Sequence, residues 1–148
     1  MTPLMVKGAL FGLLLLSAAV WDMRNREIPN LIPALLLLCG LIGFRPAASA
    51  AGLFLVGGPF LLAAVLIKRD GVAIGGGDVK LMGACGFVLG VWPGLMQAVL
   101  SLSLAVLVGL VECRLQKQPL SMVRLPLAPF FCFGGVSAYW LTAFALQI

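Results

Sequence analysis

A run of 31 residues without a charged side chain, residues 81–111, most narrowly limits the fold of this chain. As one α-helix the run would be about 46 Å long, whereas the hydrocarbon core of a bilayer is roughly 30 Å thick. The triplet Trp92, Pro93 and Gly94 lies inside the run and favours a helix break at that point. We therefore expect two consecutive membrane spans joined by a tight turn.

The composition is typical of a membrane domain. Of the 148 residues, 62% are hydrophobic and 10% are charged, against about 25% charged residues in soluble domains. So few charges cannot cover a water-facing surface, and we expect an all-α fold with residues 1–148 forming a single domain embedded in the lipid bilayer. The net charge of +5 does not indicate nucleic-acid binding, because the basic residues flank apolar stretches and form no basic face.

Charges and helix breakers divide the chain into six expected spans. They cover about residues 4–21, 28–44 and 47–67, then the two halves of 81–111, and finally a segment that begins near residue 125. The loops after spans one, three and five then hold eight of the ten basic residues, namely Arg24, Arg26, Lys68, Arg69, Lys80, Arg114, Lys117 and Arg124. Because basic loops stay in the cytoplasm, both termini are expected outside.

The first apolar segment also has features of a secretory signal, with Lys7 near its start and the small residues SAAV near its end. Arg24 and Arg26 follow it directly. These two charges favour its retention as a membrane helix whose C-terminal end faces the cytoplasm.

Two acidic residues stand out by position. Asp22 ends the first span in VWDMRNREIPN, and Asp78 opens the fourth in GGGDVKLMG, so both are expected at the cytoplasmic boundary. Taken singly, Asp22 fits an anchor that snorkels beside Arg24 and Arg26, and Asp78 fits a helix N-cap. The glycines at 75–77 favour a further role, because they allow unusual backbone conformations and the close approach of another chain.

A converging pair of carboxyl groups would supply hydrolytic chemistry. Two such groups a few ångströms apart share one proton near neutral pH. The ionised group can deprotonate a water molecule, and the protonated group can protonate the leaving amine. The sequence alone does not assign the proton to Asp22 or to Asp78. The other acids, Asp70, Glu27 and Glu112, are interpreted as turn or boundary residues.

Neither a metal nor another cofactor is expected. The chain has no histidine, and its cysteines form no CxxC pair, lying far apart at Cys39, Cys85, Cys113 and Cys132. Zinc sites need clusters of such ligands.

Three segments resemble the type IV prepilin peptidase family of membrane-embedded aspartic proteases. GGGD matches the GxGD signature that ends in Asp78. DMRNREIPN at 22–30 is similar to the segment with the family's first aspartate, and GGGDVKLMG at 75–83 is similar to the segment with the second. RLPLAPFFCFGG at 124–135 resembles the start of the last span. The three segments follow the family's order.

The resemblance implies an enzyme of the bacterial inner membrane that removes the short basic leader of prepilins or pseudopilins at the cytoplasmic face. It also implies that Asp22 and Asp78 form the catalytic pair. The residues that would support the motif or bind substrate are Gly75, Gly77, Lys80, Pro29 and Asn30.

One departure from the family bears on a second activity. Members that also N-methylate the new N-terminus often carry a cytoplasmic insert with paired cysteines after the first span. Here the corresponding loop, residues 23–27, has no cysteine. The chain therefore resembles the short members of tight-adherence (Flp-type) pilus systems, and methyltransferase activity is not assigned.

Other functions fit parts of the pattern. A presenilin-like protease would use the same two acids to cut within a transmembrane helix. A small proton-coupled transporter would need an acid near mid-span, where this chain has none. A purely structural membrane subunit would tolerate substitution of both aspartates.

Overall fold

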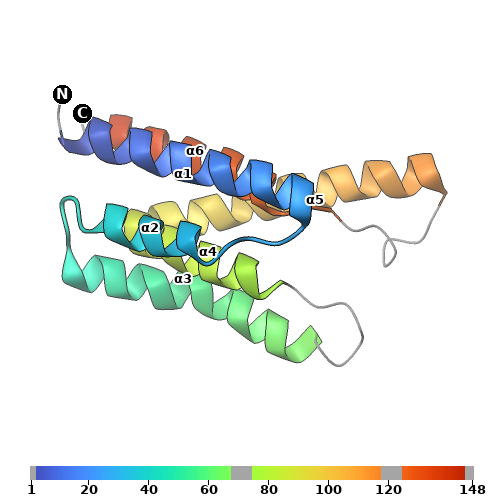
Figure 1. Cartoon of the computed structure of the whole chain (residues 1–148), viewed down its shortest axis with the longest axis horizontal. Helices are drawn as coiled ribbons and strands as arrows, with labels where there is room; N and C mark the ends of the chain where they lie inside the picture. Colours follow the sequence, from blue (N-terminus) through green and yellow to red (C-terminus); the bar gives the residue numbers. More distant parts are fainter. Residues whose placement is uncertain (1–2, 68–74, 118–124, 146–148) are drawn as a thin grey trace.

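The structure, a computed structural model, is described over residues 3–67, 75–117 and 125–145, and within these ranges its regular structure is entirely α-helical (Figure 1). The helices are α1 (Pro3–Asn25), α2 (Leu31–Gly40), α3 (Pro46–Ile67), α4 (Gly76–Leu89), α5 (Val91–Gln116) and α6 (Ala128–Ala145). The expectations for Lys68, Arg69, Asp70 and Arg124 lie outside the described residues.

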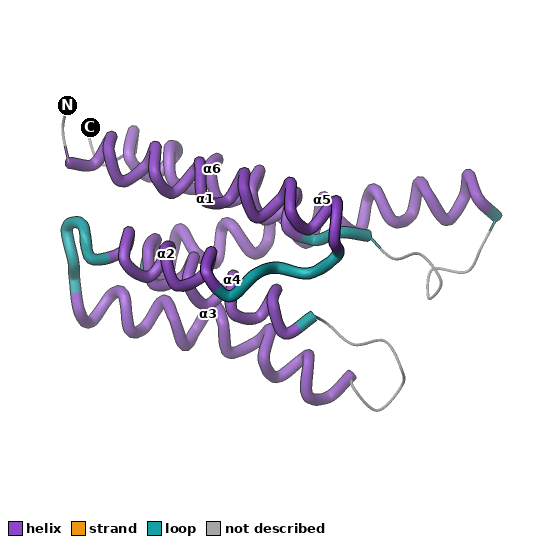
Figure 2. The backbone as a smooth tube through the Cα atoms, in the orientation of Figure 1, coloured by secondary structure: helices purple, strands orange, loops and turns teal. Residues whose placement is uncertain are grey.

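Successive helices run in alternating directions, so the chain crosses the bundle back and forth, and both of its ends lie at the same end of the bundle (Figures 1 and 2). Helix α4 packs against α2 and α3, while α6 packs against α1 and α5. The C-terminal ends of α1, α3 and α5 therefore lie at one end of the bundle, together with the N-terminal ends of α4 and α6 (Figure 1).

Four helices, α1, α3, α5 and α6, are long and apolar enough to cross a membrane. Their outward faces carry large apolar side chains such as Leu13, Phe54 and Trp92, which are exposed, as expected where lipid is the solvent. Helices α2 and α4 have 10 and 14 residues, which correspond to about 15 and 21 Å. Helix α2 is shorter than the segment 28–44 that the sequence predicted.

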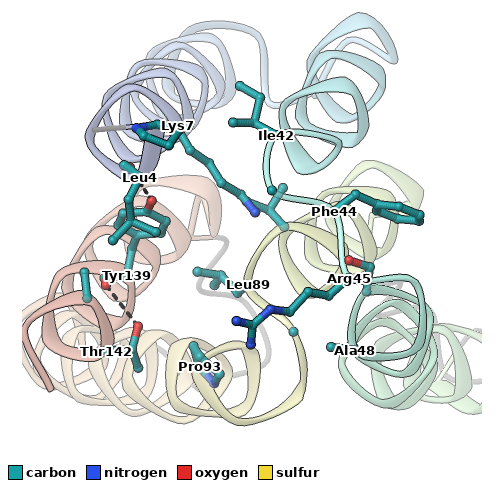
Figure 3. A pocket seen from close by; sticks show the side chains of 16 residues that line it. Leu4, Lys7, Ile42, Phe44, Arg45, Ala48, Leu89, Pro93, Tyr139 and Thr142 are labelled. Atoms are coloured by element: carbon teal, nitrogen blue, oxygen red, sulfur yellow. Dashed lines mark hydrogen bonds between the residues drawn. The ribbon is translucent and has the colours of Figure 1, made fainter. Parts of the chain in front are cut away.

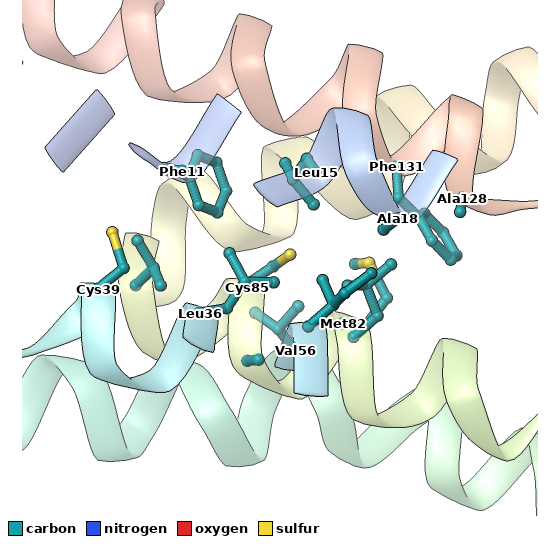
Figure 4. Packing of buried hydrophobic residues seen from close by; sticks show 14 of the residues in the cluster. Phe11, Leu15, Ala18, Leu36, Cys39, Val56, Met82, Cys85, Ala128 and Phe131 are labelled. Atoms are coloured by element: carbon teal, nitrogen blue, oxygen red, sulfur yellow. The ribbon is translucent and has the colours of Figure 1, made fainter. Parts of the chain in front are cut away.

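The bundle encloses a core drawn from five of the helices (Figure 4). Phe11 and Leu15 of α1 meet Leu36 of α2, Met82 of α4 and Phe131 of α6 there, and all five side chains are fully buried. This packing fixes the relative positions of α1, α4 and α6, the three helices whose ends carry the candidate site.

The turn that divides residues 81–111 lies at Gly90, so the break predicted at 92–94 was wrong. Gly90 ends α4 and precedes α5, and its φ of 82° is a left-handed value that glycine adopts most readily. Pro93 and Gly94 instead lie in the first turn of α5. Proline is tolerated there because the N–H groups of a first turn have no partner within the helix.

Candidate active site

Asp22 is buried near the C-terminal end of α1, with 7% of its surface exposed. Its Oδ2 accepts a hydrogen bond of 3.0 Å from the backbone N–H of Ala128, the first residue of α6. In that first turn Pro129 has no N–H, and the N–H of Phe130 donates to the Leu127 carbonyl. The N–H of Ala128 is thus the donor left for an acceptor outside the helix.

This contact overturns the interpretation of Asp22 as a snorkelling anchor. An anchor would reach toward water beside Arg24 and Arg26, whereas this side chain is turned into the bundle against α6. A backbone N–H and the positive end of a helix dipole both favour a negatively charged carboxylate. The N-terminus of α6 therefore holds the Asp22 side chain inside the bundle.

Asp78 lies in the first turn of α4, at the same end of the bundle, before the charge-free segment that begins at Leu81. It is half-buried. Burial raises the pKa of the Asp78 carboxyl to about 6, and the negative charge of Asp22 contributes to the same rise in pKa. The two carboxyl groups are thus close enough to interact electrostatically, although 56 positions separate them in the sequence.

Asp78 does not cap α4, contrary to the simpler interpretation of its position. Gly75 is the N-cap residue, and no side-chain hydrogen bond caps the helix. The carboxyl group of Asp78 is therefore not used in closing the end of α4.

The glycines before Asp78 provide space, and their backbone angles are ordinary. None of Gly75, Gly76 and Gly77 has a positive φ, so the prediction of unusual backbone conformations was wrong. A Cβ added to Gly77 would lie 3.1 Å from the Cβ of Ile28, and one added to Gly75 would lie 3.2 Å from Asp78 Oδ2. Gly77 lets the segment after α1 approach α4, and Gly75 leaves room for the carboxyl group itself.

A second contact joins the same two segments. Lys80 Nζ donates a hydrogen bond of 2.9 Å to Oδ1 of Asn30, which lies 50 positions earlier at the start of α2. The carbonyl of Pro29, next to it, accepts from the N–H of Ile32 and closes the first turn of α2. Lys80 and Asn30 thus hold the connection between α1 and α2 against α4, next to the two aspartates.

The sequence interpretation missed Ala128 and Ile28, which contact the site through a backbone N–H and an apolar side chain. A backbone donor leaves no signature in residue type. The proline-rich start of the last span, PLAPFF at 126–131, was the available signal, because prolines near a helix start reduce the number of free N–H groups there.

The chain matches the type IV leader peptidase family over residues 9–111, a range that includes both Asp22 and Asp78. It belongs to this family. A relative from Bacillus subtilis (strain 168), named prepilin leader peptidase/N-methyltransferase, is 34% identical over 147 residues, an alignment that covers 89% of this chain and 54% of the relative. The chain thus spans about half the length of that relative. No solved structure matches it.

Membership of the type IV leader peptidase family confirms the resemblance identified from the three sequence segments. The matched residues extend from α1 into α5, so they contain the two carboxyl groups and the connection between α1 and α2. Ala128 lies beyond residue 111, and its contact with Asp22 comes from the structure alone.

Proposed function

We propose that this chain is a membrane-embedded aspartic endopeptidase that removes the short basic leader of prepilin or pseudopilin substrates. The observation that carries the proposal is the pair of interacting carboxyl groups at one end of the bundle, Asp22 against the N–H of Ala128 and Asp78 with a raised pKa. Such a pair of unequal acids is what metal-free peptide hydrolysis requires. Membership of the leader peptidase family supports the choice of substrate.

Asp22 is the general base and Asp78 the general acid of the proposed mechanism. The ionised Asp22 takes a proton from water, whose oxygen attacks the carbonyl carbon of the scissile bond. The protonated Asp78 donates a hydrogen bond to the carbonyl oxygen and then transfers its proton to the amine nitrogen as the C–N bond breaks. The pair still holds one proton afterwards, now on Asp22, and this proton returns to Asp78 before the next cycle.

The assignment of roles follows from the two environments. Asp22 accepts a hydrogen bond from a backbone N–H at a helix N-terminus, an arrangement that suits a general base. Asp78 has no such donor among the described residues, and the neighbouring negative charge favours its neutral form. Two carboxyl groups whose environments differ in this way divide into a base and an acid.

The proposed enzyme lies in the bacterial inner membrane with six spans, both termini outside and the two aspartates at the cytoplasmic face. The distribution of described cations supports this orientation. Arg24, Arg26, Lys80 and Lys117 belong to the end of the bundle that carries the aspartates, as expected of a cytoplasmic side. Helices α2 and α4 would cross together with the turns that flank them.

The proposal covers leader removal alone. The relative's name includes an N-methyltransferase activity, but residues 23–27 of this chain contain no paired cysteines. A prepilin with a basic leader and a hydrophobic helix is the expected partner, and its scissile bond would lie at the cytoplasmic boundary of the membrane.

The test is processing of a co-expressed prepilin by Asp22→Asn and Asp78→Asn variants, measured as the ratio of mature to precursor pilin. Each substitution is expected to lower cleavage by at least about 10³-fold, because it removes one half of the acid–base pair. Glu112→Gln is the matched control, since it neutralises an acid of α5 to which the proposal gives no role. Normal processing by both aspartate variants, at unchanged levels in the membrane, would refute the proposal.

A further inference from the structure

A cavity of about 550 Å³ lies at the end of the bundle opposite the aspartates (Figure 3). Its walls come from the N-terminal parts of α1 and α5, the C-terminal parts of α4 and α6, and the turn between α2 and α3. Because of this position it is no part of the proposed peptidase site.

Two cations face this cavity, and none of the described residues that line it offers a counter-ion. Figure 3 shows the side chains of Lys7, from α1, and Arg45, from the turn before α3, directed into it. None of the described residues that line it is acidic. Neither cationic group has a hydrogen-bond or ion-pair partner within the described part of the chain, and the charge of Arg45 opposes that of Lys7.

Lys7 is half-buried beside the like charge of the exposed Arg45, and a cation withdrawn from water without a partner is costly. An anion placed between Lys7 and Arg45 would offset this cost, and a guanidinium beside an ammonium is a combination that binds phosphate well. The electrostatics of the cavity therefore favours a phosphate group as occupant.

The remaining walls indicate what the phosphate is attached to. Leu4, Ile42, Phe44, Leu89 and Pro93 give the cavity an apolar lining. Leu4 and Phe44 are also exposed, so part of this apolar lining is accessible to a lipid chain. A free anion would gain nothing from this apolar surface, whereas a molecule with a phosphate and an acyl chain would use both parts.

We propose that this cavity is a binding site for an anionic phospholipid, with Lys7 and Arg45 on the phosphate and an acyl chain along the apolar wall. The two cations lie where the ends of α1 and α2 meet a membrane surface, at the depth of phospholipid headgroups. A lipid in this position would bridge α1, α6 and the α2–α3 turn, and so stabilise the bundle at the end that lacks the catalytic pair.

The experiment uses the full chain purified in a neutral detergent, with dihexanoyl phosphatidylglycerol as the probe and thermal unfolding as the readout. The lipid is expected to raise the Tm in a saturable way. Lys7→Gln/Arg45→Gln is expected to weaken its apparent affinity by roughly tenfold or more, because both charge-assisted contacts are lost. The matched control Arg114→Gln/Lys117→Gln removes the same charge from the other end of the bundle and is expected to bind as wild type.

Three results would overturn the proposal. The first is equal binding by the cavity variant and the control. The second is the same rise in Tm with inorganic phosphate at the same concentration, which would indicate a site for a free anion. The third is the same rise with an uncharged hexyl maltoside, which would indicate an apolar cavity alone.

A second variant covers the case in which the double substitution does not fold. Ala48→Leu fills the cavity without altering either charge, since Ala48 is among its lining residues. It is expected to lower the amount of phosphatidylglycerol that co-purifies, measured by mass spectrometry. Unchanged retention of the lipid in this variant would also contradict the proposal.

Discussion

At the residue scale, the contact between Ala128 and Asp22 can be removed without touching either carboxyl group. Ala128→Pro deletes the N–H donor, and proline is well tolerated at the first position of a helix. A charge-assisted hydrogen bond contributes about 1.5–3 kcal/mol, so we expect a roughly tenfold to hundredfold loss of cleavage near neutral pH. The loss is expected because Asp22 then lacks the donor that holds its carboxyl group against α6.

Ala128→Gly is the control, because it keeps the N–H and alters the same buried position. The kcat/KM of both variants, measured with a purified prepilin, separates loss of the N–H from a change of packing at this position. A loss in the proline variant alone supports a role for the contact with Asp22, whereas an equal loss in both variants would indicate structural damage and contradict that role.

The raised pKa of Asp78 predicts the alkaline limb of the pH–rate profile. An acid is active only while protonated, and burial holds the pKa of Asp78 at about 6. The protonated fraction falls as pH rises through this value, so kcat/KM is expected to decline about tenfold per pH unit above it. Thermal unfolding of the same sample over the same pH range controls for loss of the folded state. A flat profile up to pH 8 would exclude Asp78 as the acid.

How far the site could be predicted depends on which atoms build it. Asp22 and Asp78 were identified because carboxyl groups at membrane boundaries are rare and lie here in recognisable segments. The role of the Ala128 N–H could not be predicted, since every residue except proline has a backbone N–H. Ala128 also lies 106 positions from Asp22 in the sequence. The sequence indicated that another segment approaches Gly77 closely. Only the structure shows that this segment is the one with Ile28.

At the element scale, α4 lies where it does because glycines let it approach α3. A Cβ added to Gly57 of α3 would lie 2.8 Å from the Cα of Gly83 in α4. This neighbour is backbone and cannot swing aside, so Gly57→Ala must push the helices apart. We expect a loss of about 1–3 kcal/mol in stability. Cleavage is also expected to fall, because α4 carries Asp78.

The control for Gly57→Ala is Gly12→Ala in α1. The added Cβ there would lie 3.7 Å from Val136 Cγ2, an ordinary van der Waals distance. Both changes replace a helical glycine by alanine, which alone favours the helix. Thermal unfolding in detergent is therefore expected to show a lower Tm for the α3 variant than for the α1 variant, and equal values would contradict the close packing.

The order of helices could be predicted from charges and hydropathy, but their ends could not. The charge-free run gave two helices as expected, yet its proline at 93 marked a helix start and not the turn itself. A proline is compatible with either position, so Gly90 could be found only from the structure, by its left-handed backbone. The second helix, predicted over 28–44, is limited to Leu31–Gly40 because turns at both ends take the remaining residues.

At the scale of the whole molecule, the two ends of the bundle differ in what their charges face. Arg24 lies in the last turn of α1 and Arg26 directly after the helix, at the end where Asp22 is turned inward toward α6. Lys7 and Arg45 at the other end line a cavity without any acidic residue among its described walls. Prepilin cleavage and lipid binding are thus proposed at opposite membrane surfaces. Prepilin cleavage requires that the aspartate end of the bundle faces the cytoplasm.

That orientation predicts which positions a membrane-impermeant maleimide can reach. Phe44→Cys and Lys117→Cys, each made in a chain without its four native cysteines, place one thiol at either end of the bundle, and both positions are exposed. Since most of the basic residues are expected inside, Phe44→Cys should label in intact cells and Lys117→Cys only after permeabilisation. Processing of a co-expressed prepilin shows that each variant is folded. The reverse labelling pattern would place the aspartates on the outer side of the membrane. Labelling of both thiols from outside would rule out the six-span path, because that path puts the α2–α3 and α5–α6 connections on opposite sides of the membrane.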